Sequence, residues 1–134
     1  MKVTLDARNI QSISLFQNLT NSSVLDCLEE SDMIFFVVSE GQYGLAVGKN
    51  GSKIKNAERV FKKTIKVFEY SPDLNRFVSN LIPEALEVNL SEKGVQVKIK
   101  PNDKPKVIGK GGKNIRIVTK FLQRLFDVEN LKIK

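Results

Sequence analysis

Two short glycine-containing stretches hold the residues of this chain whose types and spacing could do chemistry. The first reads Val47-Gly48-Lys49-Asn50-Gly51-Ser52-Lys53-Ile54, and the second, 61 positions later, reads Ile108-Gly109-Lys110-Gly111-Gly112-Lys113-Asn114-Ile115. In each copy an aliphatic residue precedes a Gly, two variable residues beginning with Lys, a second Gly, two polar residues and an Ile. The chain therefore contains an internal repeat built around a GxxG loop.

Such a loop suits the phosphates of a nucleic-acid backbone. Glycines allow close approach because they have no Cβ. A helix that begins at the second Gly presents unpaired N–H groups and the positive end of its dipole to an anionic oxygen. Lys49 and Lys110 add a mobile positive charge at each loop. We therefore predict that each copy holds a short piece of nucleic acid.

Each of these residues also has a purely structural explanation. The glycines could form a tight turn between helices, and Lys49 and Lys110 could be solvated surface residues. A turn alone does not require Lys twice at the same place, so we favour the phosphate interpretation. Charged residues of the following helix are either phosphate contacts or an ordinary solvated face, and these are Lys53, Lys55, Lys113 and Arg116.

Histidine is absent and Cys27 is the single cysteine. An internal disulfide, a Cys/His zinc site and a mechanism with His as acid or base are therefore excluded, and we predict no metal and no cofactor. We expect Cys27 to be a buried structural thiol, because it lies in an apolar stretch.

The positive charge is concentrated on the repeat. The net charge is +7, yet residues 48–66 carry seven basic and one acidic side chain and residues 98–126 carry nine and one, whereas residues 1–47 and 67–97 are net acidic. Both basic blocks coincide with a glycine loop and the helix after it. This distribution predicts a polyanionic partner.

Other classes of function fit the sequence poorly. The Gly44 to Lys49 spacing is one residue too short for a Walker-type loop, and Asn50 stands where Ser or Thr would hold magnesium. We predict no enzymatic activity and no small-molecule substrate. Neither a membrane span nor a signal peptide is present, so we expect no membrane partner and a cytoplasmic location.

Hydrophobic periodicity predicts the same order of elements around each loop. In the first copy we expect a helix at 6–19, strands at 24–29 and 33–39 with the second one central, a short helix at 41–47, a helix at 52–63 and a strand at 65–70. In the second we expect a helix that is capped by Ser71 and ends at Leu81, strands at 87–90 and 95–100, a helical turn at 101–106, a long helix after the loop and a strand at 131–134. The stripe of the long helix is Ile115, Val118, Leu122 and Leu125.

These patterns predict an α+β protein of two domains, at residues 1–70 and 71–134. Each has the order α-β-β-α-α-β, with a three-stranded sheet and its helices packed on one face. The connection is very short, so we expect the two domains to pack rigidly and their loops to share one surface.

The repeated aliphatic-Gly-x-x-Gly-x-x-Ile signature, set between a short and a long helix, resembles tandem KH domains of type II. The stretch Gly44-Leu45-Ala46-Val47-Gly48-Lys49 and the short connection are similar to the archaeal NusA family of two-KH proteins. This resemblance implies a transcription elongation or termination factor that clamps single-stranded RNA with its GxxG loops. RNA polymerase is implied as a second partner by kinship alone.

The resemblance also assigns an RNA-binding set. In KH domains the aliphatic residues beside the loop line a narrow groove, so Val47 and Ile108 could meet bases, whereas Ile54 and Ile115 fit the core better. Tyr43 could stack on a base or pack. The full set is Val47, Gly48, Lys49, Asn50, Gly51, Lys53, Ile54, Lys55, Ile108, Gly109, Lys110, Gly111, Gly112, Lys113, Ile115 and Arg116.

The two loops differ at one position, and two alternative functions remain open. Asn50 in the first loop replaces Gly111 of the second, so the two loops need not bind equally well. The RNA-binding role could belong to ribosome assembly or RNA decay. The chain could also be a protein-interaction module that has lost RNA binding.

Overall fold

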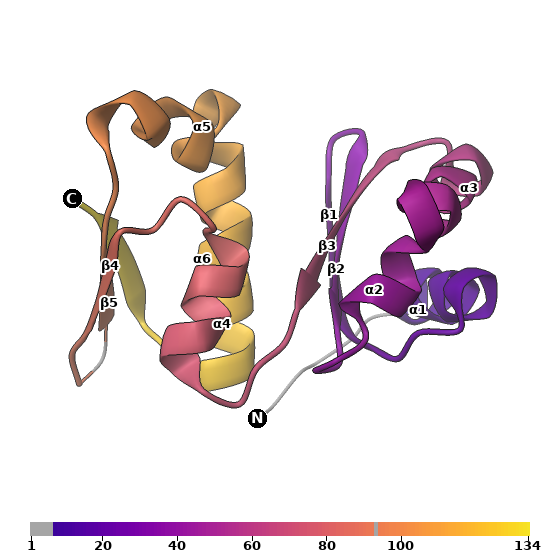
Figure 1. The fold of residues 1–134 in the computed structure, drawn as a ribbon, viewed down its shortest axis with the longest axis horizontal. Helices are drawn as coiled ribbons and strands as arrows, with labels where there is room; N and C mark the ends of the chain where they lie inside the picture. The colour runs from indigo at the N-terminus through magenta and orange to yellow at the C-terminus, as the bar shows by residue number, and fades with distance from the viewer. Residues whose placement is uncertain (1–6, 93) are drawn as a thin grey trace. The chain divides into compact units, whose positions relative to one another are not determined.

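A computed structural model describes residues 7–92 and 94–134 of the chain. The described residues form two compact units, of which the first extends to Ser71 and the second begins at Pro72. Figure 1 shows that each unit places its helices against a small sheet.

The first unit has the predicted order of elements. They are α1 (Ala7–Thr20), β1 (Val24–Glu30), β2 (Met33–Val38), α2 (Tyr43–Val47), a 3-10 turn (Lys49–Gly51), α3 (Ser52–Phe61) and β3 (Thr64–Glu69). The predicted start of the first helix at Asp6 lies outside the described residues.

The second unit repeats this order. Its elements are α4 (Leu74–Leu81), β4 (Glu87–Leu90), β5 (Gly94–Lys98), a 3-10 turn (Pro101–Asp103), α5 (Lys104–Ile108), a second 3-10 turn (Lys110–Gly112), α6 (Lys113–Phe126) and β6 (Asn130–Ile133). The predicted α+β class and the α-β-β-α-α-β order are confirmed.

The first sheet has the strand order β1-β2-β3. β1 pairs antiparallel with β2, and β2 pairs parallel with β3, with Phe36 opposite Cys27 on one side and Val67 on the other. A parallel pair needs a long crossover, which α2, the loop and α3 supply. β2 is central, as its unbroken apolar sequence predicts, and all of its residues except Met33 are buried.

Helices α1, α2 and α3 supply the core on one face of this sheet. Phe16 of α1 stacks on Phe36 with 4.1 Å between ring centroids, and Phe61 of α3 meets Phe36 edge-on. Ala46 and Ala57 are fully buried in the same cluster. Cys27 also lies in this core at 1% exposure, which confirms the predicted structural thiol.

The second sheet has the order β4-β5-β6 with the same antiparallel and parallel pairings. Val95 and Val97 of β5 are buried, while Gln96 is half-buried and Lys98 exposed, so one face is solvated as predicted. The helices of this unit add buried apolar residues, which are Phe77, Val78 and Leu81 from α4, Val107 from α5 and Ile117, Val118, Phe121, Leu122 and Leu125 from α6.

The predicted cap of α4 is wrong. Asp73 is the N-cap residue, and its carboxylate accepts a hydrogen bond from the Asn75 N–H at 3.2 Å, whereas Ser71 is buried two residues upstream. Asp caps a helix at least as well as Ser, so the residue after Pro72 takes the role.

Other element ends differ from the predictions by one or two residues. α3 ends at Phe61 because Lys62 adopts a left-handed conformation (φ 59°), and Lys63 then forms an ion pair with Glu29. α6 buries a broader face than the predicted stripe, because Ile117 and Phe121 are buried while Ile115 is half-buried.

Candidate nucleic-acid interface

Both GxxG loops begin with a glycine in a conformation that other residues rarely adopt. Gly48 has φ 78° and ψ 170°, and Gly109 has φ 81° and ψ 166°. This region of backbone space is almost restricted to glycine. Each glycine ends a five-residue helix, α2 or α5, and turns the chain into the loop.

Close packing gives these two positions a second reason to be glycine. A Cβ on Gly48 would lie 2.9 Å from the Lys53 backbone nitrogen, and a Cβ on Gly109 would lie 2.8 Å from that of Asn114. The first turn of the following helix therefore packs directly against the loop. The tight-turn explanation accounts for the first glycine of each loop whether or not a ligand binds.

The middle residue of each loop has a different backbone conformation from the first glycine and is open to solvent. Asn50 (φ 55°, ψ 28°) and Gly111 (φ 63°, ψ 19°) both adopt the left-handed conformation, which Asn tolerates better than most residues. No atom lies within 4 Å of a Cβ built on Gly111. The two loops thus have the same backbone course despite the Asn50 to Gly111 difference.

The second glycine closes each loop and starts the long helix. Gly51 N–H donates to the Gly48 carbonyl at 3.1 Å, and Gly112 N–H donates to the Gly109 carbonyl at 3.0 Å. No side chain caps the start of α3 or of α6. The positive ends of two helices of 10 and 14 residues therefore face the loops without a side-chain cap, while the backbone N–H of their first residues, Ser52 and Lys113, donates to the Lys49 and Lys110 carbonyls.

The lysine at the first variable position is exposed in both loops. Neither Lys49 nor Lys110 forms an ion pair within the described part of the chain. Lys55 is also exposed, and Lys113 is half-buried. The loops therefore combine helix N-termini that carry no side-chain cap with mobile ammonium groups, an arrangement suited to phosphate oxygens.

The Lys53 side chain is engaged within the protein, whereas its sequence position indicated either a phosphate contact or a solvated face. Its ammonium donates to the Thr20 carbonyl at 2.8 Å, which caps the C-terminal end of α1. The corresponding residue of the second unit, Asn114, donates through its side-chain amide to the Lys106 carbonyl of α5 at 3.1 Å. Both side chains fasten the start of the long helix to an earlier helix, and sequence reasoning gave Asn114 no role.

Arg116 folds back over the second loop. Its guanidinium donates to the Gly111 carbonyl at 2.6 Å, so it holds the loop backbone and carries positive charge to the loop tip. In the first unit the Lys55 side chain lies beside Gly51, where a Cβ built on Gly51 would lie 3.8 Å from its Cε.

The aliphatic residues beside the loops differ in exposure. Ile54 packs against the first core, in agreement with the core interpretation, and Val47 and Ile115 are half-buried. Ile108 is 37% exposed beside the second loop. Tyr43 is 46% exposed at the start of α2, where its backbone N–H donates to Glu69.

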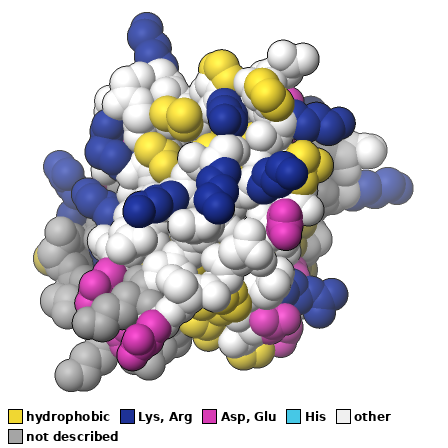
Figure 2. Space-filling view, turned by 90° about the vertical axis from the view of Figure 1, so that its left-hand side faces the viewer, with side chains coloured by type: hydrophobic (Ala, Val, Ile, Leu, Met, Phe, Trp, Pro, Cys, Tyr) yellow, Lys and Arg dark blue, Asp and Glu magenta, His cyan; other side chains and the backbone are white. Residues whose placement is uncertain are grey.

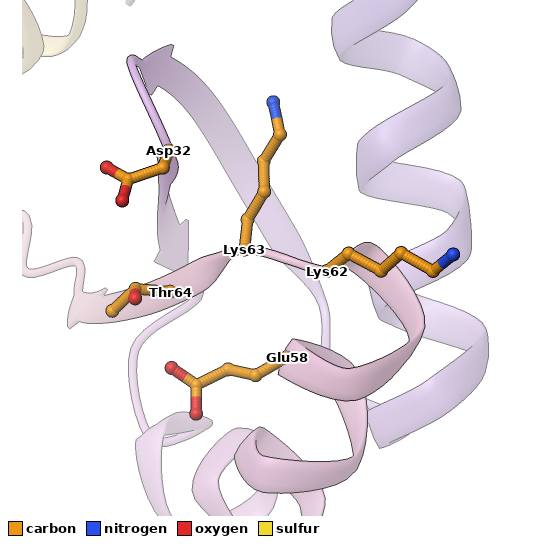
Figure 3. A pocket seen from close by; sticks show the side chains of 5 residues that line it. All are labelled: Asp32, Glu58, Lys62, Lys63 and Thr64. Carbon is orange, nitrogen blue, oxygen red and sulfur yellow. The ribbon is translucent and has the colours of Figure 1, made fainter.

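A hollow of about 320 Å³ lies at the far end of the first sheet, away from the loop. Figure 3 shows that the side chains of Asp32, Glu58 and Lys63 diverge there. Glu58 accepts from the Ile65 N–H at 2.9 Å, and the Asp32 carbonyl accepts from the Thr64 N–H. These groups serve the fold and bring no reactive set together.

Two other kinds of site are absent from residues 7–92 and 94–134. Those residues contain no group of three or more Cys, Asp or Glu side chains arranged to hold a metal ion. They also contain no helix with the length and apolar character needed to cross a bilayer.

Both units match known protein families. The NusA-like second KH domain matches residues 74–134, and the KH domain matches residues 11–90. The crystal structure of APE1850 superposes with a TM-score of 0.78 at 34% identity, over 97% of this chain and 100% of that one.

Curated relatives match over almost the whole chain. It is 37% identical to the probable transcription termination protein NusA of Methanococcus vannielii, over 99% of this chain and 80% of that protein. The proteins of the same name from Methanocaldococcus jannaschii and Thermoplasma acidophilum are 34% and 32% identical, with 75% and 96% of their lengths covered. With two KH matches and near full-length identity above 30%, this chain belongs to the archaeal NusA family of tandem KH-domain proteins.

Proposed function

We propose that this protein binds single-stranded RNA through both GxxG loops and acts in transcription elongation or termination, without catalysing a reaction. The observation that carries the proposal is the shared backbone of the two loops, in which a glycine-only conformation is followed by a left-handed tip and a helix start without a side-chain cap. If the loops were only turns between helices, their common backbone conformation would not require Lys at the same position in both.

The role in transcription is supported by kinship. The relatives are named as probable transcription termination proteins. RNA binding would place the protein on the transcript, and RNA polymerase would be its second partner in the cytoplasm. Recovery of ribosomal RNA without polymerase in a pull-down would contradict this assignment and favour ribosome assembly.

The RNA-binding sites would comprise the loops and their flanks. Lys49 and Lys110 would contact phosphates, with Lys55, Lys113 and Arg116 along the adjoining helices. Val47 and the exposed Ile108 would contact bases in the groove beside each loop. Lys53 would act mainly by fastening α3 to Thr20, because its ammonium is already engaged there.

The first test is RNA affinity as a function of salt. Each phosphate that the protein neutralises adds a slope of about −0.7 to the plot of log affinity against log salt for a single strand. We expect random single-stranded RNA to bind at low salt with a slope that reflects several phosphates. Absence of retention at low salt would favour the interaction module that has lost RNA binding.

The second test reverses charge at the loop tips. Lys110→Asp with Gly111→Asp should abolish binding by the second loop, and Lys49→Asp with Asn50→Asp should do so for the first. Asp tolerates the left-handed conformation at these open positions, so thermal melting should change little. The matched control, Asn75→Asp with Arg76→Asp on exposed positions of α4, makes the same change in formal charge. If the loop variants unfold, the loops are structural. If the control loses RNA equally, the loss is not specific to the loops and they are not the binding sites.

A further inference from the structure

The second sheet presents a lysine-rich face that the GxxG loop does not use. Because Val95, Val97 and Ile99 point into the core, Lys98 and Lys100 project from the opposite side of the sheet. We define the lysine face as the surface formed by Lys98, Lys100, Lys104, Lys132 and Lys134. Figure 2 shows Lys and Arg side chains gathered across the upper half of this view, with the acidic side chains mostly below them.

Strand pairing brings these lysines close together. Lys132 of β6 lies beside Gln96 of β5. One step further, Lys134 N–H donates to the Val97 carbonyl at 2.8 Å, which sets Lys134 beside Lys98. Like charges on neighbouring strands repel, so this arrangement destabilises the free protein slightly and favours a bound anion.

The protein itself neutralises little of this charge. Within the described residues none of the five lysines forms an ion pair, and Glu87, opposite Lys98 on β4, is the one acidic side chain of the pocket beside them. By contrast, Lys106 on the neighbouring helix turn pairs with Glu84 at 3.3 Å. The lysine face therefore keeps a net positive charge.

A pocket of about 560 Å³ opens at the end of this face. Lys98, Lys104 and Lys134 surround it, Pro101 gives it an apolar wall, and the Asn89 side chain supplies an amide. Ammonium groups suit phosphate oxygens, while an apolar wall with an amide suits the face and edge of a base. The lining thus has the chemistry of a nucleotide subsite.

Helix α5 connects this pocket to the second GxxG loop. Lys104, its first residue, lines the pocket, and Gly109 follows its last residue. Five residues of helix span about 8 Å along the axis. A strand held at residues 109–112 needs only a short continuation to reach the pocket.

We propose that the lysine face and its pocket are an additional RNA-binding surface, which holds the nucleotides that continue beyond the second GxxG loop. The inference rests on the proposed RNA binding by that loop. An acidic protein segment would also be attracted to these lysines. The amide, the apolar wall and the adjoining loop favour a nucleic-acid strand instead.

The test compares a short and a long single-stranded RNA. A KH loop clamps about four nucleotides, so a four-nucleotide RNA reports the loops, and a twelve-nucleotide RNA also reaches the lysine face. Lys98→Gln with Lys134→Gln should leave the short RNA unaffected. For the long RNA it should weaken binding about five- to tenfold and reduce the salt slope by about 1.4.

The control removes the same charge elsewhere. Lys66→Gln with Arg76→Gln, both at exposed positions outside the lysine face, should leave the long RNA unaffected. If the lysine-face variant binds both RNAs as the unmodified protein does, or weakens both equally, the inference is wrong while RNA binding stands. If the unmodified protein binds neither RNA, the proposed function itself fails.

Lysine acetylation of the unmodified protein gives a second readout without mutation. The twelve-nucleotide RNA should protect Lys98, Lys104 and Lys134 from the reagent, and the four-nucleotide RNA should protect Lys110 alone among these four. Equal reactivity of Lys98 and Lys134 with and without the long RNA would overturn the inference.

Discussion

The glycines within one loop are required for different reasons. Gly109 has a backbone conformation that only glycine adopts readily and is packed against the start of α6, whereas Gly111 stands in open space. The first glycine therefore belongs to the fold, and the loop tip is available to a ligand. The repeat already separates the two positions, because Gly109 corresponds to Gly48 whereas Gly111 corresponds to Asn50. The close contact that requires the first glycine is visible only in the structure.

Alanine substitution should separate the two roles. Gly109→Ala should lower the free energy of unfolding by roughly 1–3 kcal/mol from backbone strain, and by more from the contact with Asn114. Gly111→Ala should cost about 1 kcal/mol, because it strains the backbone without a clash. Urea unfolding of both variants measures the difference, and equal losses would contradict it.

Lys53 shows that the charge of a residue and its position beside a loop do not by themselves assign its contact. Lys53 follows a GxxG loop in a basic block, and that pattern favours phosphate contact. Its ammonium instead meets the Thr20 carbonyl, 33 residues away along the chain. Only the packing of α1 beside α3 decides this contact, and no local pattern contains it.

At the scale of elements, periodicity and turn residues predicted every helix and strand of both units. The central position of β2 followed from its apolar sequence, and the open face of β5 from its alternation. The ends of the helices and strands differed from the predictions by one or two residues, because several neighbouring residues can each end a helix. Lys62 in a left-handed conformation ended α3 before the predicted Lys63, and no glycine marks this position.

The start of α4 gives a test at this scale. Asp73→Ala should destabilise the protein by about 1 kcal/mol, because the Asn75 N–H loses its acceptor. Asp73→Asn should cost much less, since an amide oxygen can still accept. Thermal melting of both variants measures this, and an unchanged midpoint for the Ala variant would show that Asp73 is not the effective cap.

At the scale of the whole molecule, the chain has two complete KH units with one loop each. Residues 70–73 alone connect β3 to α4. If both loops bind RNA as proposed, a single RNA that engages one loop raises the effective concentration of RNA at the other. This bivalency is open to test without assuming how the two units are oriented.

The loop variants provide that test on a long RNA. If one strand visits both loops, either Asp–Asp loop variant alone should weaken a long RNA by more than tenfold, and combining them should abolish binding. A four-nucleotide RNA should lose only the affinity of the altered loop. Equal fold-changes for long and short RNA, measured by fluorescence anisotropy, would show that the loops bind independently.

The sequence by itself determined the repeat, the order of elements, the α+β class, the buried thiol and the concentration of charge on two loops. These depend on local spacing and periodicity, which act between residues close in the chain. Tertiary structure alone decided that Lys53 caps α1 and that Lys98, Lys104 and Lys134 surround one pocket. Such contacts join residues that only strand register and helix packing bring together.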